Sequence, residues 1–232
     1  MGVAIVIVLY LVITYIFTDT TKTDLLVMHD GSVRKVISAE DLIGANSANY
    51  SYSFWLYINT WNYGYGSKKV VFRRFKQGEN NLIEAVLDTT NNDLQINMAY
   101  SGDKVNSKTH KCAVKNIPLQ KWTNIIVSLN NKAIDIYLDG KLVKTCVLPG
   151  VQTPKPNQNL IVADKSSKTI EGTGFSGFIA KLRFYSRTVN PREAYEIYKE
   201  GHGSGWLANL LSKYKLKFAF LKNNKEVNSV TF

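Results

Sequence analysis

The sequence predicts an antiparallel all-β protein, and three observations lead to this prediction. From residue 25 onward, apolar and polar residues alternate in short segments. Turn dipeptides such as Asn130-Asn131 and Asp139-Gly140 separate these segments. Helix start and stop signals occur together only between residues 190 and 201. Because alternation with a period of two is typical of strands with one buried face, we expect antiparallel strands and one short helix near the C-terminus; the length suits one β-sandwich or two small domains.

The first element is an apolar run that predicts a transmembrane anchor over residues 1–18. No charged side chain occurs before Asp19, and the stretch from Met1 to Phe17 would span about 25 Å as a helix, close to the lower limit for a hydrocarbon core of about 30 Å. A cleaved signal peptide is not expected, because a basic start and a small-residue cleavage site are both missing. A buried strand or helix is the alternative. The residues of the expected anchor are Val3, Ile5, Val6, Ile7, Val8, Leu9, Leu11, Val12, Ile13, Ile16 and Phe17.

A linker and the first strands are expected over residues 19–47, and the sandwich over 48–201. The stretch NYSYSFWLYIN predicts a central strand with two different faces. LQINMAY (94–100) and WTNIIVSLN (122–130) alternate in the same way. In the central strand, one face carries Tyr50, Tyr52, Phe54, Leu56 and Ile58, and the other carries Ser51, Ser53, Trp55 and Tyr57.

A β-hairpin is predicted for AIDIYLDGKLVKTCVL (133–148). Asp139-Gly140 is the signal, because a two-residue turn of the primed type needs positive φ at both positions. Around this turn, Ile136 is expected to face Val143 on one side of the hairpin. On the other side, Asp135 is expected to face Lys144 as a cross-strand ion pair.

One helix is predicted in NPREAYEIYKEG. Asn190 can cap its start, Pro191 fits the first helical position, and Glu193 completes a capping-box-like pattern. Gly201 fits its end. Before this helix, strands are predicted in NLIVAD and over residues 178–186. After it, residues 202–232 predict a helical turn followed by a hairpin around Asn223-Asn224.

The formal net charge of +11 points to an anionic partner. Lysines and arginines cluster in the stretches SKKVVFRRFK and DKVNSKTHKCAVK. No nucleic-acid-binding motif accompanies them, so we expect lipid headgroups or an acidic protein rather than nucleic acid; a solvated basic face is the alternative. The expected basic contact surface comprises Lys68, Lys69, Arg73, Arg74, Lys76, Lys104, Lys108, Lys111 and Lys115.

The order of four stretches resembles the concanavalin A-like, laminin-G-like jelly roll. These stretches are YSFWLYI, PLQKWTNIIVSL, IDIYLDGKLV and GFSGFIAKLRFYSRTVNPREAYEIYKEG, and together they span about residues 48–201. The resemblance implies two curved antiparallel sheets packed face to face as a jelly-roll sandwich. It implies no particular activity, because this scaffold hosts lectins, glycosidases, adhesion modules and capsid components.

The overall layout also resembles that of minor capsid proteins of large icosahedral DNA viruses with an internal membrane. These features are an N-terminal anchor, a sandwich domain and a short basic tail, together with the stretch KCAVKNIPLQKW…DGKLVKTCVLPG. On this basis we expect a membrane-anchored structural protein that links a bilayer to a protein shell of capsid type. The alternative is a membrane-anchored carbohydrate-binding or adhesion module.

Catalysis, metal binding and cofactors are not expected. Glycosidases of this fold that resemble laminarinases carry a Glu-x-Asp-x-x-Glu cluster, which is missing here, and Asp135 and Asp139 have structural explanations. Ser204 in GHGSG does not occupy the central position of a nucleophile elbow. Two cysteines and three histidines make no metal-ligand spacing.

A glycan could bind to TWNYGYG, where Trp61, Tyr63 and Tyr65 alternate with small or polar residues. If these three rings are exposed on one side, they form an aromatic platform for sugar rings. The alternative is that they pack on a neighbouring strand or loop.

Membrane sidedness determines the state of Cys112, Cys146 and the sequon Asn49-Tyr50-Ser51. Lys22, Arg34 and Lys35 follow the apolar run and no cation precedes it, so the charge bias favours a sandwich on the cytosolic face, or in a virion between internal membrane and capsid. Both cysteines would then be reduced and Asn49 unmodified. On the opposite face, a disulfide between the two cysteines is expected instead.

Overall fold

The computed structural model describes residues 20–75, 81–101, 108–155, 157–164 and 173–203, and the backbone of 217–222 and 225–231. The expected anchor over residues 1–18, the helical turn after the joint, and Lys76 and Lys104 lie outside the described residues. Within the described part, no helix is both long enough and apolar enough to cross a bilayer.

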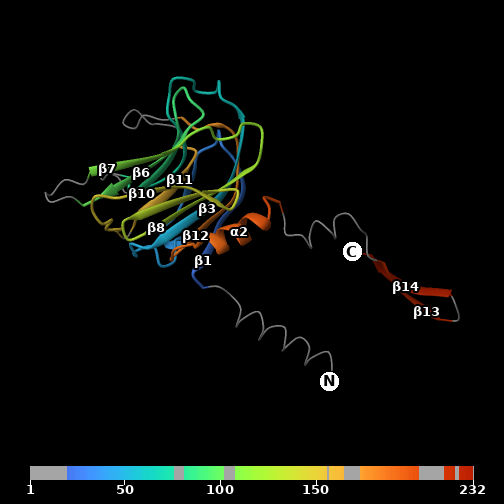
Figure 1. Cartoon of the computed structure of the whole chain (residues 1–232). Helices are drawn as coiled ribbons and strands as arrows, with labels where there is room; N and C mark the ends of the chain where they lie inside the picture. Colours follow the sequence, from blue (N-terminus) through green and yellow to red (C-terminus); the bar gives the residue numbers. More distant parts are fainter. Residues whose placement is uncertain are drawn as a thin grey trace.

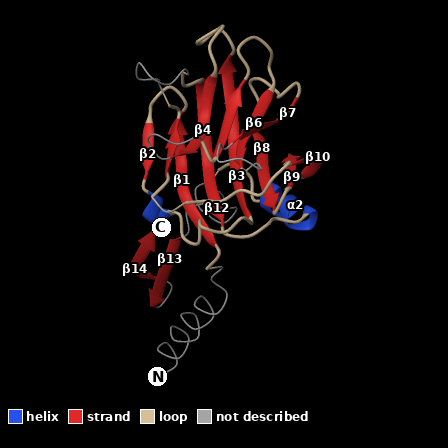
Figure 2. Cartoon of the chain, turned by 90° about the vertical axis from the view of Figure 1, so that its left-hand side faces the viewer, coloured by secondary structure: helices blue, strands red, loops and turns tan. Residues whose placement is uncertain are grey.

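Two antiparallel sheets of six strands each form the sandwich that the family resemblance implied (Figures 1 and 2). The first sheet contains, in spatial order, β1 (Lys22–Asp30), β12 (Ser176–Tyr185), β3 (Tyr50–Thr60), β8 (Thr123–Asn130), β9 (Ala133–Leu138) and β10 (Lys141–Val147). The second sheet contains β2 (Lys35–Ile37), β11 (Asn159–Val162), β4 (Lys69–Phe75), β5 (Ile83–Leu87), β6 (Leu94–Tyr100) and β7 (Lys108–Val114). The remaining elements are a 3₁₀ turn (Ala39–Asp41), helix α2 (Pro191–Lys199) and the hairpin of β13 (Lys217–Lys222) and β14 (Lys225–Thr231).

The core between the sheets confirms the predicted faces of β3. All five large residues on the predicted inner face are buried in the main hydrophobic cluster. Tyr52 contacts Phe72 of the facing sheet, with ring centroids 5.1 Å apart, and Phe54 meets the same ring edge-on at 5.4 Å. Because burial contributes roughly 1.5–3 kcal/mol for each large apolar side chain, this alternation holds β3 in one register.

Helix α2 covers part of the outer face of the first sheet. As predicted, the Asn190 side chain accepts a hydrogen bond from the Glu193 backbone N–H (2.9 Å), and Pro191 occupies the first turn. Ala194 and Ile197 of the helix are buried against an apolar patch of the sheet. The patch consists of Ile126, Tyr137 and Tyr185 of the sheet, together with Val189 of the loop before the helix.

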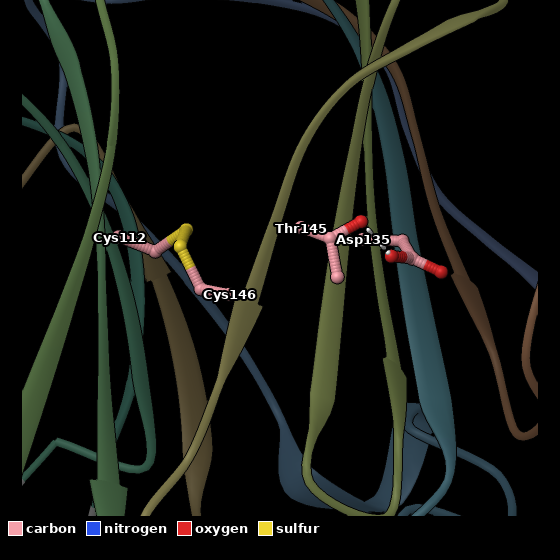
Figure 3. Close-up of a disulfide and its surroundings, with 4 residues drawn as sticks. All are labelled: Cys112, Asp135, Thr145 and Cys146. Atoms are coloured by element: carbon pink, nitrogen blue, oxygen red, sulfur yellow. Dashed lines mark hydrogen bonds between the residues drawn. A yellow bond between two sulfur atoms is a disulfide. The ribbon is translucent and has the colours of Figure 1, made fainter.

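The β9–β10 hairpin turns at Asp139 and Gly140, whose φ values of 48° and 75° match the predicted turn. Its predicted register is wrong, because the register shifts between Leu142 and Lys144. A bulge of this kind places two residues opposite one. Lys144 therefore faces Ile136, and Asp135 faces Thr145, whose hydroxyl donates a hydrogen bond of 2.6 Å to its carboxylate (Figure 3).

A disulfide between Cys112 and Cys146 closes one side of the sandwich. Cys112 lies on β7 and Cys146 on β10, which are the edge strands of the two different sheets (Figure 3). The expectation of two reduced cysteines is therefore not met. Sequence alone did not show that both residues point toward the same open edge.

A candidate ligand-binding surface on the first sheet

Six ring side chains form a continuous line over the outer face of the first sheet, which we call the aromatic stripe. They come from β3, from the residue before β8, from α2 and from the residues after α2. In spatial order the aromatic stripe consists of Tyr57, Trp122, His202, Trp55, Tyr198 and Tyr195.

Each ring of the aromatic stripe contacts the next. The His202 imidazole stacks on Trp122, with centroids 4.7 Å apart and an interplanar angle of 19°, and lies 5.7 Å from Trp55. Tyr57 lies 5.5 Å from Trp122 at one end. Toward α2, Trp55 stacks on Tyr198 at 5.8 Å, and Tyr198 lies 6.3 Å from Tyr195. All of these distances fall within the range in which aromatic pairs are favourable.

Local sequence explains how the rings meet. Trp55 and Tyr57 occupy alternate positions of β3 and so share its outer face. Tyr195 and Tyr198 are three residues apart on α2 and therefore lie on one side of the helix. Gly140 fits closely against the same helix, since a Cβ atom at this position would lie 3.0 Å from the Tyr195 Cα.

Two cations of β12 hold the chain after α2 in place. Lys181 Nζ donates hydrogen bonds to the carbonyl oxygens of Glu200 (3.3 Å) and Gly201 (2.7 Å). Arg183 pairs with the Glu200 carboxylate and, at 2.6 Å, with Asp24. These contacts fix the two residues before His202, so the imidazole is held over Trp122 and Trp55.

The surroundings of Lys181 and Arg183 also shift the pKa values of these two side chains. Burial, with the nearby Arg183 charge, lowers the pKa of Lys181. Burial acts in the same direction on Arg183, but the Glu200 and Asp24 carboxylates outweigh it and raise the net pKa of Arg183. Arg183 therefore stays charged at any ordinary pH.

The aromatic stripe is partly open to solvent. Tyr195 is 49% exposed, and Phe178, which is 41% exposed, lies next to Tyr57 in the strand register. Tyr57, Trp122 and Tyr198 are half-buried, and Trp55 is buried. Asn124 faces Trp55 in the register, and its buried Oδ1 has no hydrogen-bond partner among the described residues. The surface thus offers partly exposed rings, whereas Asn124 is fully buried and is not part of that surface.

The three rings of the predicted platform do not share one environment. Residues 61–67 form turns rather than a strand, so alternate positions do not point to one side. Trp61 packs against the main core, with Lys69 Nζ 4.7 Å from its ring centroid. Tyr63 is half-buried and Tyr65 is 64% exposed.

The predicted basic surface is only partly a surface. Lys68, Lys108, Lys111 and Lys115 are exposed. In contrast, Lys69, Arg73 and Arg74 are 1–2% exposed, because the stretch predicted as a basic cluster is strand β4, which is covered on both faces. This part of the prediction is wrong.

Each of the three buried cations has its own surroundings. Burial lowers the pKa of Lys69, whose Nζ lies near the Thr89 carbonyl oxygen (3.5 Å). Arg73 pairs with the buried carboxylate of Asp164. Arg74 Nη2 donates to the Ala45 carbonyl oxygen (3.0 Å), while its Nε and Nη1 atoms have no hydrogen-bond partner among the described residues.

Sequence reasoning placed Trp55 and Tyr57 on the outer face of their strand but did not recognise them as a site. Large aromatic residues on the otherwise polar face of a strand were the available signal. Trp122, Tyr198 and His202 join them only because α2 docks on that face.

As for metals, no group of three or more His, Cys, Asp or Glu side chains in the described part is arranged to hold an ion.

The sandwich is similar to the receptor-binding domains of botulinum neurotoxins. The binding domain of botulinum neurotoxin DC in complex with rat synaptotagmin II superposes with a TM-score of 0.55 at 12% identity, over 72% of this chain and 39% of that chain. The same domain in complex with SialylT gives 0.55 at 11%, again over 72% and 39%. A third structure comes from work on botulinum neurotoxin type C, whose cell entry depends on interaction with two ganglioside molecules. It superposes with a TM-score of 0.56 at 14% identity, over 72% of this chain and 39% of that chain.

These likenesses concern the fold. The chain spans about two-fifths of the length of the solved structures that it matches. A comparison with curated proteins finds no match. Residues 30–194, which are more than half of the sequence, match a laminin-G family model. The chain therefore belongs to the concanavalin A-like lectin/glucanases superfamily.

Proposed function

We propose that the chain is a non-catalytic carbohydrate-binding module that its N-terminal apolar segment holds at a membrane. The observation that carries the proposal is the aromatic stripe. One face of a pyranose ring is lined with C–H groups, and such a face packs well on an aromatic ring. Sugar rings would pack on the ring faces that neighbouring rings leave uncovered, on the half-buried Tyr57, Trp122 and Tyr198 and on Tyr195, which is 49% exposed.

Polar groups beside the rings support a sugar rather than a purely apolar ligand. Hydroxyl groups need hydrogen-bond partners when they leave water. The Lys121–Asp139 pair (3.3 Å) is next to Trp122 along the chain and holds the turn that follows β9. Together with the imidazole of His202, these side chains supply both donors and acceptors at the edge of the aromatic stripe.

The strand register also orients the aromatic stripe relative to the N-terminal segment. β1 begins at Lys22, which pairs with Tyr185, and Tyr185 pairs with Ser51. β1 ends at Asp30, which pairs with Phe178 beside Tyr57. The described chain therefore enters β1 at the Ser51 end of β3, which is the end opposite Tyr57, and this arrangement suits an adhesion module.

The similar structures are consistent with a ligand-binding role. The toxin domains are known in complex with rat synaptotagmin II and with SialylT, and ganglioside interaction is described for botulinum neurotoxin type C. For this chain these ligands are guides to chemical class only, and an oligosaccharide is the class that suits the aromatic stripe.

A structural role is the second candidate. The apolar run over residues 1–17 and the exposed lysines of β7 favour a protein that links a bilayer to an acidic protein shell. The viral minor capsid role rests on the sequence layout alone and stays a prediction.

Binding of the full-length chain in detergent micelles to a panel of immobilised oligosaccharides tests the proposal. We expect a selective interaction that Trp122→Ala weakens by about 2 kcal/mol, or roughly 30-fold in Kd, because truncation of a central aromatic contact has this effect. Tyr65→Ala is the matched control, since this tyrosine is 64% exposed and outside the aromatic stripe.

Two results would refute the carbohydrate proposal. One is the absence of binding to any oligosaccharide at millimolar concentration. The other is binding that Tyr65→Ala removes and Trp122→Ala leaves intact. Tight binding to an acidic protein without any glycan binding would favour the structural role, and turnover of a bound glycan would refute the non-catalytic part.

A further inference from the structure

The disulfide is a first indication of the compartment in which the sandwich matures. It joins residues 34 positions apart in sequence, on edge strands of two different sheets. The Cys112 side chain is 1% exposed, so the bridge is part of the packed core edge. Disulfides of this structural kind form and persist in oxidising compartments and are rare in the cytosol.

The sequon is a second and independent indication. Asn49-Tyr50-Ser51 is the only Asn-x-Ser/Thr triplet in the whole sequence, although asparagine is frequent. Asn49 is exposed at the start of β3. Its Oδ1 accepts a hydrogen bond from the Asn131 backbone N–H (2.8 Å), which orients the amide and leaves Nδ2 available for a substituent.

We propose that Asn49 carries an N-linked glycan and that the sandwich lies on the non-cytosolic side of a membrane, in an oxidising compartment. The co-reactant is an oligosaccharide linked to a lipid through a diphosphate. Nδ2 of Asn49 forms a bond to the anomeric carbon of the first sugar and loses one proton. The bond from that carbon to the phosphate oxygen breaks, and the lipid diphosphate leaves.

The surroundings of Ser51 place the modification before or during folding. In the folded domain this residue is buried, and its hydroxyl bonds to the Ser128 hydroxyl (3.0 Å) and to the Arg187 carbonyl oxygen (2.9 Å). An enzyme that must recognise the serine can reach it only while β3 is unpaired. The glycan is therefore expected in protein made by a cell and not in protein that is modified after folding.

The glycan leaves the aromatic stripe open. Asn49 and Tyr57 lie at opposite ends of β3, about 26 Å apart at roughly 3.3 Å per residue. Near Asn49 the first sheet ends in the turn after β8, where Asn131 has a φ of 55°. A substituent at this end projects from the sandwich rim rather than over the ring side chains.

The inference opposes the charge bias of the N-terminal segment, which favours a cytosolic sandwich. That bias rests on three cations, and Arg34 and Lys35 lie at the limit of the region in which such charges act. The disulfide and the sequon agree with each other, and neither depends on whether the aromatic stripe binds a sugar.

The test uses the full-length chain produced in cultured eukaryotic cells. We expect a single glycoform shift on electrophoresis that an N-glycosidase removes, with conversion of Asn49 to aspartate in the peptide mass map. Asn49→Gln abolishes the shift, and Asn62→Gln, an exposed asparagine outside any sequon, leaves it unchanged. In the same sample, alkylation before proteolysis is expected to recover Cys112 and Cys146 as one bridged peptide pair.

An unmodified Asn49 overturns the glycan site, even if the disulfide is present. If Cys112 and Cys146 are both recovered as alkylated thiols, the proposal of an oxidising compartment is wrong. If both occur in protein that is fully folded, the sandwich is cytosolic. Because the readouts are mass and mobility, a failed glycan-binding screen does not affect them, and they do not affect that screen.

Discussion

Reduction of the Cys112–Cys146 disulfide is expected to destabilise the sandwich strongly. The bridge closes a loop between residues 34 positions apart, which includes β8, β9 and most of β10. In the chain-entropy description, a loop of this length lowers the free energy of folding by about 3.8 kcal/mol at 25 °C. For a domain of about 200 residues, this corresponds to a loss of roughly 8–15 °C in Tm.

Thermal unfolding followed by tryptophan fluorescence measures this effect, with and without excess dithiothreitol. The double variant Cys112→Ala/Cys146→Ala is the control, since its melting temperature should be the same in both conditions and close to that of the reduced wild type. A reduced wild type that melts within about 2 °C of the oxidised protein would show that the disulfide does not stabilise the sandwich by this amount. In that case the pairing of β10 with β9 alone would be enough to keep β10 in place at the edge of the first sheet.

Three further predictions concern other parts of the sandwich. In a denaturant titration, Arg74→Met is expected to leave the free energy of unfolding unchanged or to raise it by about 1 kcal/mol. The reason is that it removes a buried charge that has no carboxylate partner in the described part. A decrease of the free energy of unfolding by more than about 2 kcal/mol would contradict this. Gly140→Ala is expected to cost more than Gly66→Ala in the same titration, since both have positive φ but only the first would bring a Cβ within 3.0 Å of α2; equal losses would contradict the contact. Burial raises the pKa of Tyr52 and of Tyr185 to about 12, so the folded state holds their protons more tightly than the unfolded state. The free energy of unfolding should therefore be constant below about pH 10 and fall as the pH rises from about 10 to about 12. A stability that stays level between these two pH values, measured by circular dichroism, would contradict this.

The strand pattern could be predicted from sequence because burial on one face imposes it. The alternation in β3 and the positive φ at Asp139 and Gly140 are properties of a few neighbouring residues, and the structure confirms both. The cap of α2 at Asn190 is equally local. The fold class and the positions of most strands and of the helix could therefore be predicted from local sequence.

Features that depend on two faces or on distant elements could not be predicted. β4 appeared to be a basic surface cluster, because sequence does not show that both of its faces are covered. The bulge between Leu142 and Lys144 changes the pairing of Asp135 without any Gly or Pro to indicate it. The aromatic stripe needs α2 to dock beside β3, and the disulfide needs two edge strands to meet.

A structure of the chain with a bound oligosaccharide would show directly whether the aromatic stripe is the binding site. We expect a pyranose ring stacked on Trp122 or Tyr57, with sugar hydroxyls bonded to the polar groups that flank the aromatic stripe. We also expect that Trp122→Ala removes the sugar and leaves the fold of the sandwich unchanged. A sugar bound instead at the turn around Tyr65, or on the outer face of the second sheet, with the aromatic stripe empty, would contradict this expectation.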